Sequence, residues 1–202
     1  MPNLKKHHFL PLTLSSLALA MGLLAGCAVP PATTPLPEMT VPPILVAIDQ
    51  TDRGVQIPLP STVLFNFGKA DLNIAQAGPY MDKIAALIKN KSSKPVAVEG
   101  HTDNVGSLEA NQNLSEARAR VVRDALLARG VPAERLKAEG FAYLRPVVSN
   151  SNDEGRALNR RVEIMILDEK LENITAGEPA NTFQSALSRL KAMVDQGLVK
   201  PL

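Results

Sequence analysis

The sequence predicts an α+β fold: a two-layer sandwich in which two main helices cover one face of a mixed sheet, preceded by a β-hairpin. From residue 44 onward, short β-prone runs alternate with two long stretches of helical apolar spacing, in the order βαβαβ-β after the hairpin. The composition is 45% hydrophobic but only 3% aromatic, which indicates a core of aliphatic side chains. A cluster of prolines between residues 30 and 43 disfavours helices and central strands, so we expect the folded domain to begin after it.

Residues 1–26 have the features of a bacterial signal peptide. Lys5 and Lys6 precede an apolar stretch, Phe9 to Leu24, that is short for a membrane span. The segment ends in Leu24-Ala25-Gly26-Cys27, which is similar to a lipobox, where the cysteine is lipidated and cleavage occurs before it. An ordinary signal peptide with an incidental cysteine is the alternative.

Cys27 is the only cysteine, so a disulfide within one chain is impossible. Two acyl chains, palmitate among them, would anchor the protein stably where one chain would not. By resemblance to enterobacterial lipoproteins, Ala28 after the cysteine favours transfer to the outer membrane. The domain would then face the periplasm.

Residues 27–43 hold the cysteine and a proline-rich tether. At about 3.1 Å per residue, an extended tether would reach at most about 50 Å. A linker of no set length is the alternative. Cleavage would remove two of the 22 basic residues and none of the 20 acidic ones, leaving a formally neutral chain. Neutrality argues against nucleic acid as a partner.

Residues 44–168 are expected to form the domain. A hairpin is predicted within residues 44–60, with strands at Val46–Ile48 and Val55–Ile57 and a turn at Asp49–Gly54. Val63–Phe67 is predicted as the next strand. Helical spacing follows from residue 72 to residue 90, and the helix is expected to begin near Pro79, because proline inside a helix costs about 3 kcal/mol.

Val96–Gly100 is a β-prone run, and helical spacing resumes from about Asn111 until Gly130, a residue typical of the C′ position. Two further strands are predicted, at Leu136–Phe141 and Arg161–Leu167. The second alternates, so that Val162, Ile164 and Ile166 share one face. A polar loop, Ser149–Gly155, is expected between these strands.

Residues 169–202 are predicted to be a tail with an amphipathic helix. Apolar residues fall at helical spacing, and the end of the stretch weakly resembles a short helical C-terminal motif found on many bacterial proteins. Two interpretations stay open. The helix packs on its own domain, or it binds a protein partner in the envelope. The apolar positions are Phe183, Leu187, Leu190 and Val194.

The chemistry is concentrated in the loop and helix that follow Val96–Gly100. Asp103 lies on the loop, and Arg118 lies about two turns after Asn111, so that Asn111, Leu114 or Ser115, and Arg118 can share one helical face. A carboxylate and a guanidinium beside one helix start suit a zwitterion, whose amine and acid are held together. Alternatively, Asp103 and Arg118 pair with each other, or Asp103 caps a turn.

The segment GHTDNVGSLEANQNLSEARA, residues 100–119, resembles the signature of the OmpA-like peptidoglycan-binding family, the C-terminal domain of outer membrane protein A and of peptidoglycan-associated lipoprotein. The family pattern is roughly G-H/Y-T-D, then N-x-x-L-S, then R-A. Residues 63–72 resemble the family's first core strand and its exit, and residues 155–163 resemble its G-R-x-x-N-R-R-V-E motif. The resemblance covers about residues 46–168 and implies the same fold.

The resemblance implies a non-catalytic module that holds the meso-diaminopimelate of the peptidoglycan stem peptide. Asp103 would take the ammonium and Arg118 the carboxylate. Arg161 would brace the loop, or form a buried ion pair instead. The other implied site residues are Asn111, Leu114 and Ser115 around the pocket, Thr102 and Asn104 in the loop, and Phe67 and Gly68 as a wall.

Gly68 departs from the family pattern, because many relatives carry Asp or Asn there, so one polar contact is expected to be missing. The tail and this departure favour an alternative function, in which the fold serves as a protein-interaction module for secretion, assembly or signalling in the envelope. Binding to isolated cell walls separates this alternative from the first.

The sequence does not favour an enzyme, a cofactor or a metal. His101 is the only histidine left after cleavage, and neither a G-x-S-x-G motif nor a phosphate-binding glycine loop is present. A zinc site would need His101 with carboxylates only, which is an unusual ligand set. Asp103 with Glu99 is weak evidence for a glycosidase, because nearby carboxylates are common.

Overall fold

The computed structural model describes residues 44–66, 68–179 and 181–202. The signal peptide, Cys27, the tether and Phe67 lie outside these residues, so the expectations placed on them remain predictions. Within the described ranges, no helix has the length and hydrophobicity needed to span a bilayer.

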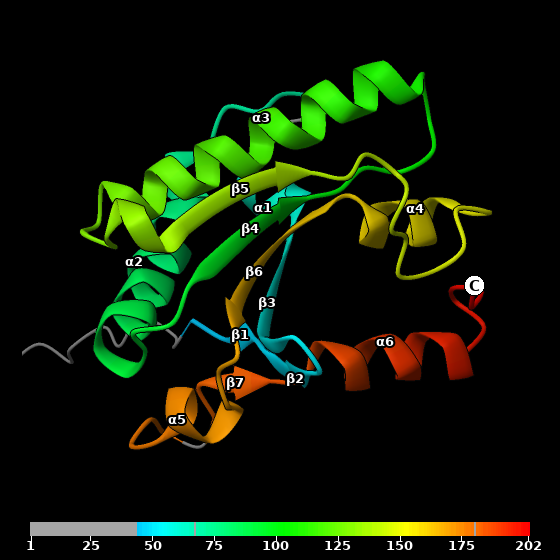
Figure 1. The fold of residues 1–202 in the computed structure, drawn as a ribbon. Coiled ribbons are helices and arrows are strands. Elements are labelled where there is room, and N and C mark those ends of the chain that lie inside the picture. Colours follow the sequence, from blue (N-terminus) through cyan, green and yellow to red (C-terminus); the bar gives the residue numbers. More distant parts are fainter. Residues whose placement is uncertain (1–43, 67, 180) are drawn as a thin grey trace, which may run out of the picture. The chain divides into compact units, whose positions relative to one another are not determined.

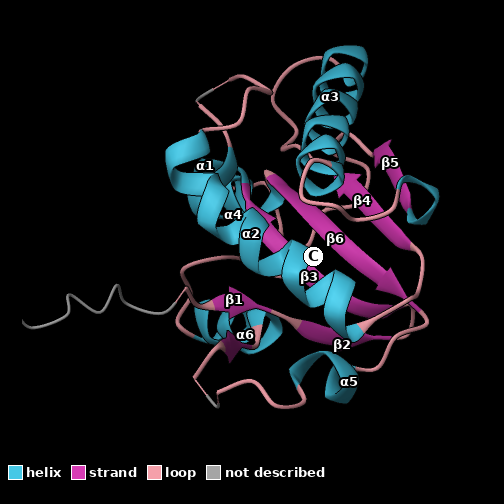
Figure 2. Cartoon of the chain, turned by 90° about the vertical axis from the view of Figure 1, so that its left-hand side faces the viewer, coloured by secondary structure: helices cyan, strands magenta, loops and turns pink. Residues whose placement is uncertain are grey.

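A five-stranded mixed sheet forms one layer of the domain (Figure 2). Its strand order is β2-β3-β6-β4-β5, in which β4 and β5 are parallel and every other neighbouring pair is antiparallel. The prediction of a mixed sheet is confirmed. The strands are β2 (Asp49–Thr51), β3 (Gly54–Pro60), β4 (Val96–Gly100), β5 (Leu136–Gly140) and β6 (Arg161–Leu167).

Two long helices, α2 (Ile74–Lys91) and α3 (Leu108–Leu127), cover one face of the sheet (Figure 2). The core between the layers is aliphatic, as the composition predicts. Its largest fully buried side chains come from both layers, so that burial of apolar surface holds the helices to the sheet. They include Ile57, Ile84, Ile88, Leu126, Ile164 and Ile166.

The remaining helices are short and lie at the ends of the sheet or in the tail (Figure 1). They are α1 (Ser61–Leu64), the 3₁₀ turn η1 (Ala133–Arg135), α4 (Asp153–Asn159), α5 (Leu171–Thr175) and α6 (Ala186–Asp195).

The predicted hairpin is present, but its first strand is displaced along the chain. β2 pairs with β3 through a turn at Asp52 and Arg53, where Gly54 has φ +135°. Val46–Ala47 forms a separate strand, β1, that pairs in parallel with β7 (Phe183–Gln184) of the tail. The long-range partner on the tail explains why these β-prone residues leave the hairpin.

The prediction of a strand at Val63–Phe67 is wrong. Residues 61–64 form the single helical turn α1, and Phe65 makes only an isolated bridge to Leu72. β6 begins at Arg161, opposite Pro60, so the chain beyond Pro60 has no neighbouring strand in the sheet. A helical turn bonds its own backbone groups, as Phe65 N–H does to Ser61 O.

The helix expected near Pro79 begins five residues earlier, at Ile74. Asn73 caps it, accepting a hydrogen bond from Gln76 N–H, and Pro79 lies inside the helix. Proline removes the bond to the carbonyl of Ala75, but Ala75 and Pro79 are both exposed, so water can solvate that carbonyl.

The second helix, α3, begins three residues before the expected Asn111, because Ser107 caps it by accepting from Ala110 N–H. Its end agrees with the prediction. Gly130 has φ +82°, and its N–H donates to Leu127 O while Val131 N–H donates to Leu126 O. These two bonds form a Schellman motif with Gly130 at C′.

The segment predicted as a polar loop, Ser149–Gly155, contains the start of α4, so this prediction is wrong in its second half. Asn152 caps the helix by accepting from Gly155 N–H, and Asp153 and Glu154 follow in the first turn. Acidic residues there interact favourably with the helix dipole. The sequence thus contains a helix start signal at Asn152, but the helix has only seven residues, too few for an apolar period to be recognised.

The tail contacts the domain on both sides of α6. The carboxylate of Asp49 accepts from Ser185 Oγ–H at 2.6 Å and from Leu187 N–H at 3.0 Å, next to the start of α6. Near the C-terminus, Lys200 O accepts from Ser149 N–H, and Val199 is buried. Helix α6 itself has no fully buried residue, so its outer face stays available.

Candidate functional site

The candidate site lies where β4 ends, α3 begins and β6 begins. Asp103 follows β4 on the loop leading to α3, Arg118 lies on α3, and Arg160 immediately precedes β6. The loop between β4 and α3 and the segment containing α4 lie at the same end of the sheet (Figure 1). The fold therefore brings together residues from three separate parts of the chain.

Asp103 is 8% exposed and uses both of its oxygens. Oδ1 accepts from Val105 N–H at 3.1 Å, so the side chain caps a turn, as one of the alternatives proposed. Oδ2 accepts from Arg160 Nη1 at 2.6 Å. The carboxylate thus pairs with Arg160 and not with Arg118.

Arg118 is 4% exposed and is held in place from two sides. Its Nε donates to Lys69 O at 3.0 Å, and its Cζ lies 5.1 Å from the centre of the Phe65 ring. Among the described residues, no hydrogen-bond partner contacts Nη1 or Nη2. Burial and the charge of Arg160 lower the pKa of Arg118, and Asp103 opposes them. The guanidinium therefore presents an edge that has no partner in the described part of the chain.

Asn111 and Ser115 share the buried face of α3 with Arg118, but both bond to the protein itself. Asn111 Nδ2 donates to Val105 O at 2.9 Å, which fixes the loop after Asp103. Ser115 Oγ donates to Gln112 O and accepts from Ala142 N–H, each at 3.0 Å. These two residues position the site more than they line it.

Two glycines let α3 approach the sheet backbone to backbone. A Cβ on Gly100 would lie 2.0 Å from Ser115 O, and one on Gly140 would lie 2.4 Å from Glu116 N. No side chain fits at those distances, so glycine at these positions sets the separation between Asp103 and the helix that carries Arg118.

The other predicted site residues differ in exposure. Thr102 is buried, and its Oγ1 has no hydrogen-bond partner among the described residues. Asn104 is exposed and Leu114 is half-buried. Gly68 is exposed with φ +69°, and a Cβ there would meet nothing within 4 Å.

Arg161 does not brace the loop in this structure. Its Nε donates to Glu163 Oε1 at 2.6 Å in an ion pair that is 7% exposed on each side, which agrees with the alternative of a buried ion pair. Its remaining bonds go to the carbonyls of Asn159 and Arg145. The contact with Asp103 is made by Arg160, which sequence reasoning missed.

Glu99, His101 and Glu163 form a buried cluster whose possible ligand atoms lie within 4.8 Å of one another. Arg53 Nη2 contacts Glu99 Oε1 at 2.5 Å, and Arg161 holds Glu163. Burial, followed by the charges of three arginines, lowers the pKa of His101 to about 3. Burial and the three positive charges also oppose an added metal ion, and both carboxylates already face arginines, so the cluster suits an ion-pair network better than a metal site.

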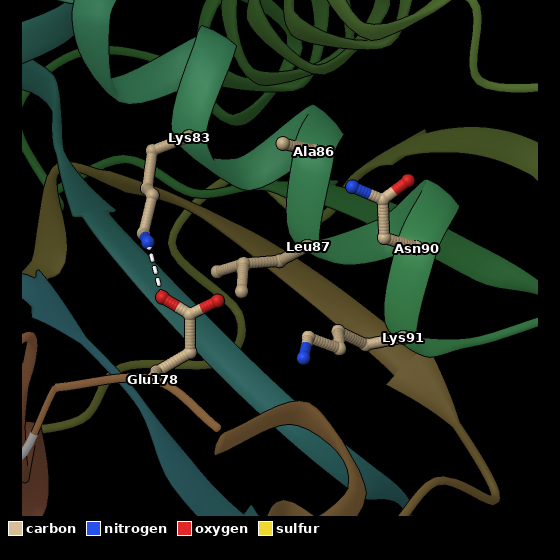
Figure 3. A pocket seen from close by; sticks show the side chains of 6 residues that line it. All are labelled: Lys83, Ala86, Leu87, Asn90, Lys91 and Glu178. Carbon is tan, nitrogen blue, oxygen red and sulfur yellow. Dashed lines mark hydrogen bonds and ion pairs between the residues drawn. The ribbon is translucent and has the colours of Figure 1, made fainter. Parts of the chain in front are cut away.

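A small hollow of about 40 Å³ lies between α2 and the segment after α5 (Figure 3). Lys83 Nζ contacts Glu178 Oε2 across it at 2.5 Å, and Lys91 Nζ donates to Ala176 O nearby. The hollow contains none of the predicted site residues. These contacts join the tail to α2 and leave little room for a ligand.

The chain is similar to known proteins over the part that contains this site. The model of the OmpA family matches residues 64–160, a range that includes Asp103, Arg118 and Arg160. The chain is 35% identical over 121 residues to "Probable lipoprotein YiaD" of Escherichia coli, covering 60% of this chain and 55% of that protein. It is 41% identical over 86 residues to "Peptidoglycan-binding protein ArfA" of Mycobacterium tuberculosis, covering 43% of this chain and 26% of that protein.

Among solved structures, the chain is similar to the cell wall anchor of the T6SS from Pseudomonas aeruginosa. The TM-score is 0.55 at 35% sequence identity, over 60% of this chain and 87% of that one. The chain spans about half of the YiaD protein and a smaller share of ArfA.

Proposed function

The chain belongs to the OmpA family, whose peptidoglycan-binding domains are not enzymes, and we propose that it is a lipoprotein that attaches the outer membrane to the cell wall. In this proposal the domain holds the side-chain end of diaminopimelate in the stem peptide. That end carries one ammonium and one carboxylate, which are complementary to Asp103 and Arg118.

The observation that carries the proposal is the state of Arg118. Its guanidinium is buried, and Nε is already used by Lys69 O, while Nη1 and Nη2 have no partner in the described part of the chain. A buried charge without an opposite charge is costly, so the site favours a ligand with a carboxylate. The two terminal nitrogens can hold it in a fork.

Asp103 supplies the other half of the proposed site. Each carboxylate oxygen can accept more than one hydrogen bond, so a ligand ammonium can share the group with Val105 N–H and Arg160. Competition with Arg160 weakens the attraction. We expect micromolar or weaker binding of a fragment, about −8 kcal/mol or less favourable, with many anchored copies strengthening attachment to the polymer.

Lipid anchoring rests on the sequence of residues 24–27 and on the proline-rich tether. The similarity to a protein named as a probable lipoprotein supports it. Mass spectrometry of the protein purified from membranes tests it, since Cys27→Ser is expected to remove the acyl mass and to release the chain from the membrane fraction. An unchanged mass in that variant would refute anchoring through Cys27.

A protein-interaction module is the second candidate function. It is favoured by α6, where Leu187 is 64% exposed on a helix with no fully buried residue. Such a helix can serve a partner in the envelope. A module used only for protein partners is expected to stay in solution when cell walls are pelleted.

Cosedimentation with isolated sacculi tests the binding function. The purified full chain, kept in detergent, is expected to pellet, and free diaminopimelate is expected to compete. Asp103→Ala and Arg118→Ala should each abolish pelleting. Arg120→Ala is the matched control, because Arg120 lies on the same helix, is exposed and pairs with Glu116. Full pelleting by both site variants would overturn the assignment.

A further inference from the structure

Among the described residues, the ligand-free site brings together two arginines, Arg118 and Arg160, and one carboxylate, that of Asp103. Arg160 and Asp103 form an ion pair at 2.6 Å, and together they are neutral. Arg118 is then left with one uncompensated positive charge in a buried position. Burial and the charge of Arg160 both lower the pKa of Arg118, and Asp103 is the single charge that raises it. The surroundings of Arg118 are therefore positive on balance.

The two arginines also have unused hydrogen-bonding edges. Arg118 donates through Nε to Lys69 O, and Arg160 donates through Nη1 to Asp103. In the described ranges, no hydrogen bond is formed by Nη1 or Nη2 of Arg118, or by Nε or Nη2 of Arg160. A zwitterionic end has a single carboxylate, which can bind only one of these two arginine edges. Because a zwitterion has no net charge, the site would keep its charge of +1.

We propose that the site recognises a ligand end with two carboxylates and one ammonium. This inference rests on the proposed function and narrows its substrate to stem peptides that stop at diaminopimelate. In such a peptide, the peptide-linked end of diaminopimelate carries a free carboxylate in addition to the ammonium and carboxylate of the side-chain end. The ammonium contacts Asp103, one carboxylate binds Arg118, and the second binds Arg160, so that a ligand of charge −1 neutralises a site of charge +1.

Arg160 is suited to this second contact. Its side chain is 32% exposed, whereas that of Asp103 is 12% exposed, so a ligand can reach the guanidinium while the ion pair persists. When the chain continues beyond diaminopimelate, the α-carboxylate becomes an amide. An amide has one acceptor oxygen and no charge, and cannot accept a charged fork from arginine. A stem peptide that ends at diaminopimelate is therefore bound more tightly than one that continues beyond it.

Isothermal titration of the purified full chain with two soluble peptides tests this preference. Both are N-acetyl-L-Ala-γ-D-Glu-meso-diaminopimelate. They differ only at the carboxyl group of the peptide-linked end of diaminopimelate, which is free in one peptide and a methylamide in the other. We expect the free acid to bind about tenfold more tightly. In Arg160→Gln the preference should fall to about onefold, because the second arginine edge is gone. Arg156→Gln is the matched control on α4, and it should keep the preference.

The outcomes separate the inference from the function on which it rests. Equal affinity of the two peptides for the native chain, within twofold, overturns the second-carboxylate contact but leaves diaminopimelate binding intact. Absence of binding by either peptide overturns the proposed function. A preference that persists in a folded Arg160→Gln protein, as judged by its circular dichroism and melting temperature, overturns the assignment to Arg160. The two-peptide comparison does not depend on any variant.

Discussion

Arg160 Nη1 donates to Asp103 Oδ2 across 2.6 Å, so the carboxylate proposed to hold a ligand ammonium is already paired in the ligand-free protein. The pair joins residues 57 positions apart and fixes the loop after β4 against the start of β6. It keeps the carboxylate in one orientation before ligand binds. Preorganisation of this kind lowers the entropy lost on binding, while competition from Arg160 limits the affinity.

Arg118→Lys should weaken binding to cell walls although it keeps the positive charge. A lysine ammonium cannot donate to Lys69 O and hold a carboxylate in a fork at the same time. We expect a loss of about 1–2 kcal/mol, or roughly tenfold in affinity. Titration with the N-acetyl tripeptide measures it, with Arg120→Lys as control on the exposed side of α3. Equal losses in both variants would mean that the loss does not come from the contacts of Arg118 in the site.

Gly100→Ala should unfold or strongly destabilise the domain, by about 3 kcal/mol or more, because its Cβ would lie 2.0 Å from the backbone oxygen of Ser115. Gly78→Ala is the matched control. Gly78 is buried in α2, but its nearest neighbour to a new Cβ is a flexible Arg129 nitrogen at 4.0 Å. Alanine there should stabilise the helix by up to about 1 kcal/mol. Urea denaturation measures both, and similar curves would contradict the close approach of α3.

The two-layer arrangement could be predicted because its elements are long enough for their apolar period to identify a buried face. In β6, Val162, Ile164 and Ile166 share one face and are all fully buried. The run Val63–Phe67 has only five residues, and its conformation depends on the fact that β6 begins opposite Pro60 and offers no strand partner beyond it. That information is long-range, so the local pattern does not contain it.

Asp103 and Arg118 could be proposed as site residues from the motif, but the contact of Arg160 with Asp103 could not be predicted. Arg160 and Arg161 are adjacent residues of the same type, and neighbouring positions at a strand start point to opposite faces. A shift of one residue would exchange their roles. The register that pairs Arg161 with Pro60 directs Arg161 to Glu163 and leaves Arg160 beside Asp103.

Gly68→Asn should strengthen binding with little effect on stability. Gly68 has φ +69° and open space around the position of a Cβ, and asparagine tolerates this backbone region better than most residues. Its amide would add a polar group at the wall of the proposed site, and we expect a gain of about 0.5–1.5 kcal/mol per new hydrogen bond. Gly68→Ala is the control, which should bind no better than the native chain and melt slightly lower. A gain in Gly68→Ala would rule out a polar contact as the cause.

Asp49→Ala should loosen the tail without changing the binding site. The substitution removes the acceptor for Ser185 Oγ–H and Leu187 N–H at the start of α6, and we expect a loss of about 1–3 kcal/mol. Hydrogen exchange should speed up across α6, while affinity for the tripeptide stays constant. Asp52→Ala, an exposed residue in the same hairpin, is the control. Unchanged exchange in α6 would show that Asp49 does not hold the tail.

His101→Tyr should flatten the pH dependence of stability between pH 6.5 and 5. The pKa of His101 is lowered from 6.5 to about 3 in the folded protein, first by burial and then by nearby arginines. The unfolded chain therefore takes up a proton that the folded chain excludes, so stability falls as the pH drops through this window, by up to about 1.4 kcal/mol per pH unit.

The family pattern allows tyrosine at this position, and a tyrosine side chain stays neutral over the same pH range. The stability of the His101→Tyr protein should therefore not depend on this proton. The quantity to compare is the slope of unfolding free energy against pH, because the larger ring also changes packing against Phe141, which lies 5.6 Å from the His101 ring centre. Packing shifts the whole curve, whereas proton uptake changes its slope. Parallel curves for the native and His101→Tyr proteins would mean that His101 takes up its proton in the folded protein as well, so that neither burial nor the three arginines keeps it neutral.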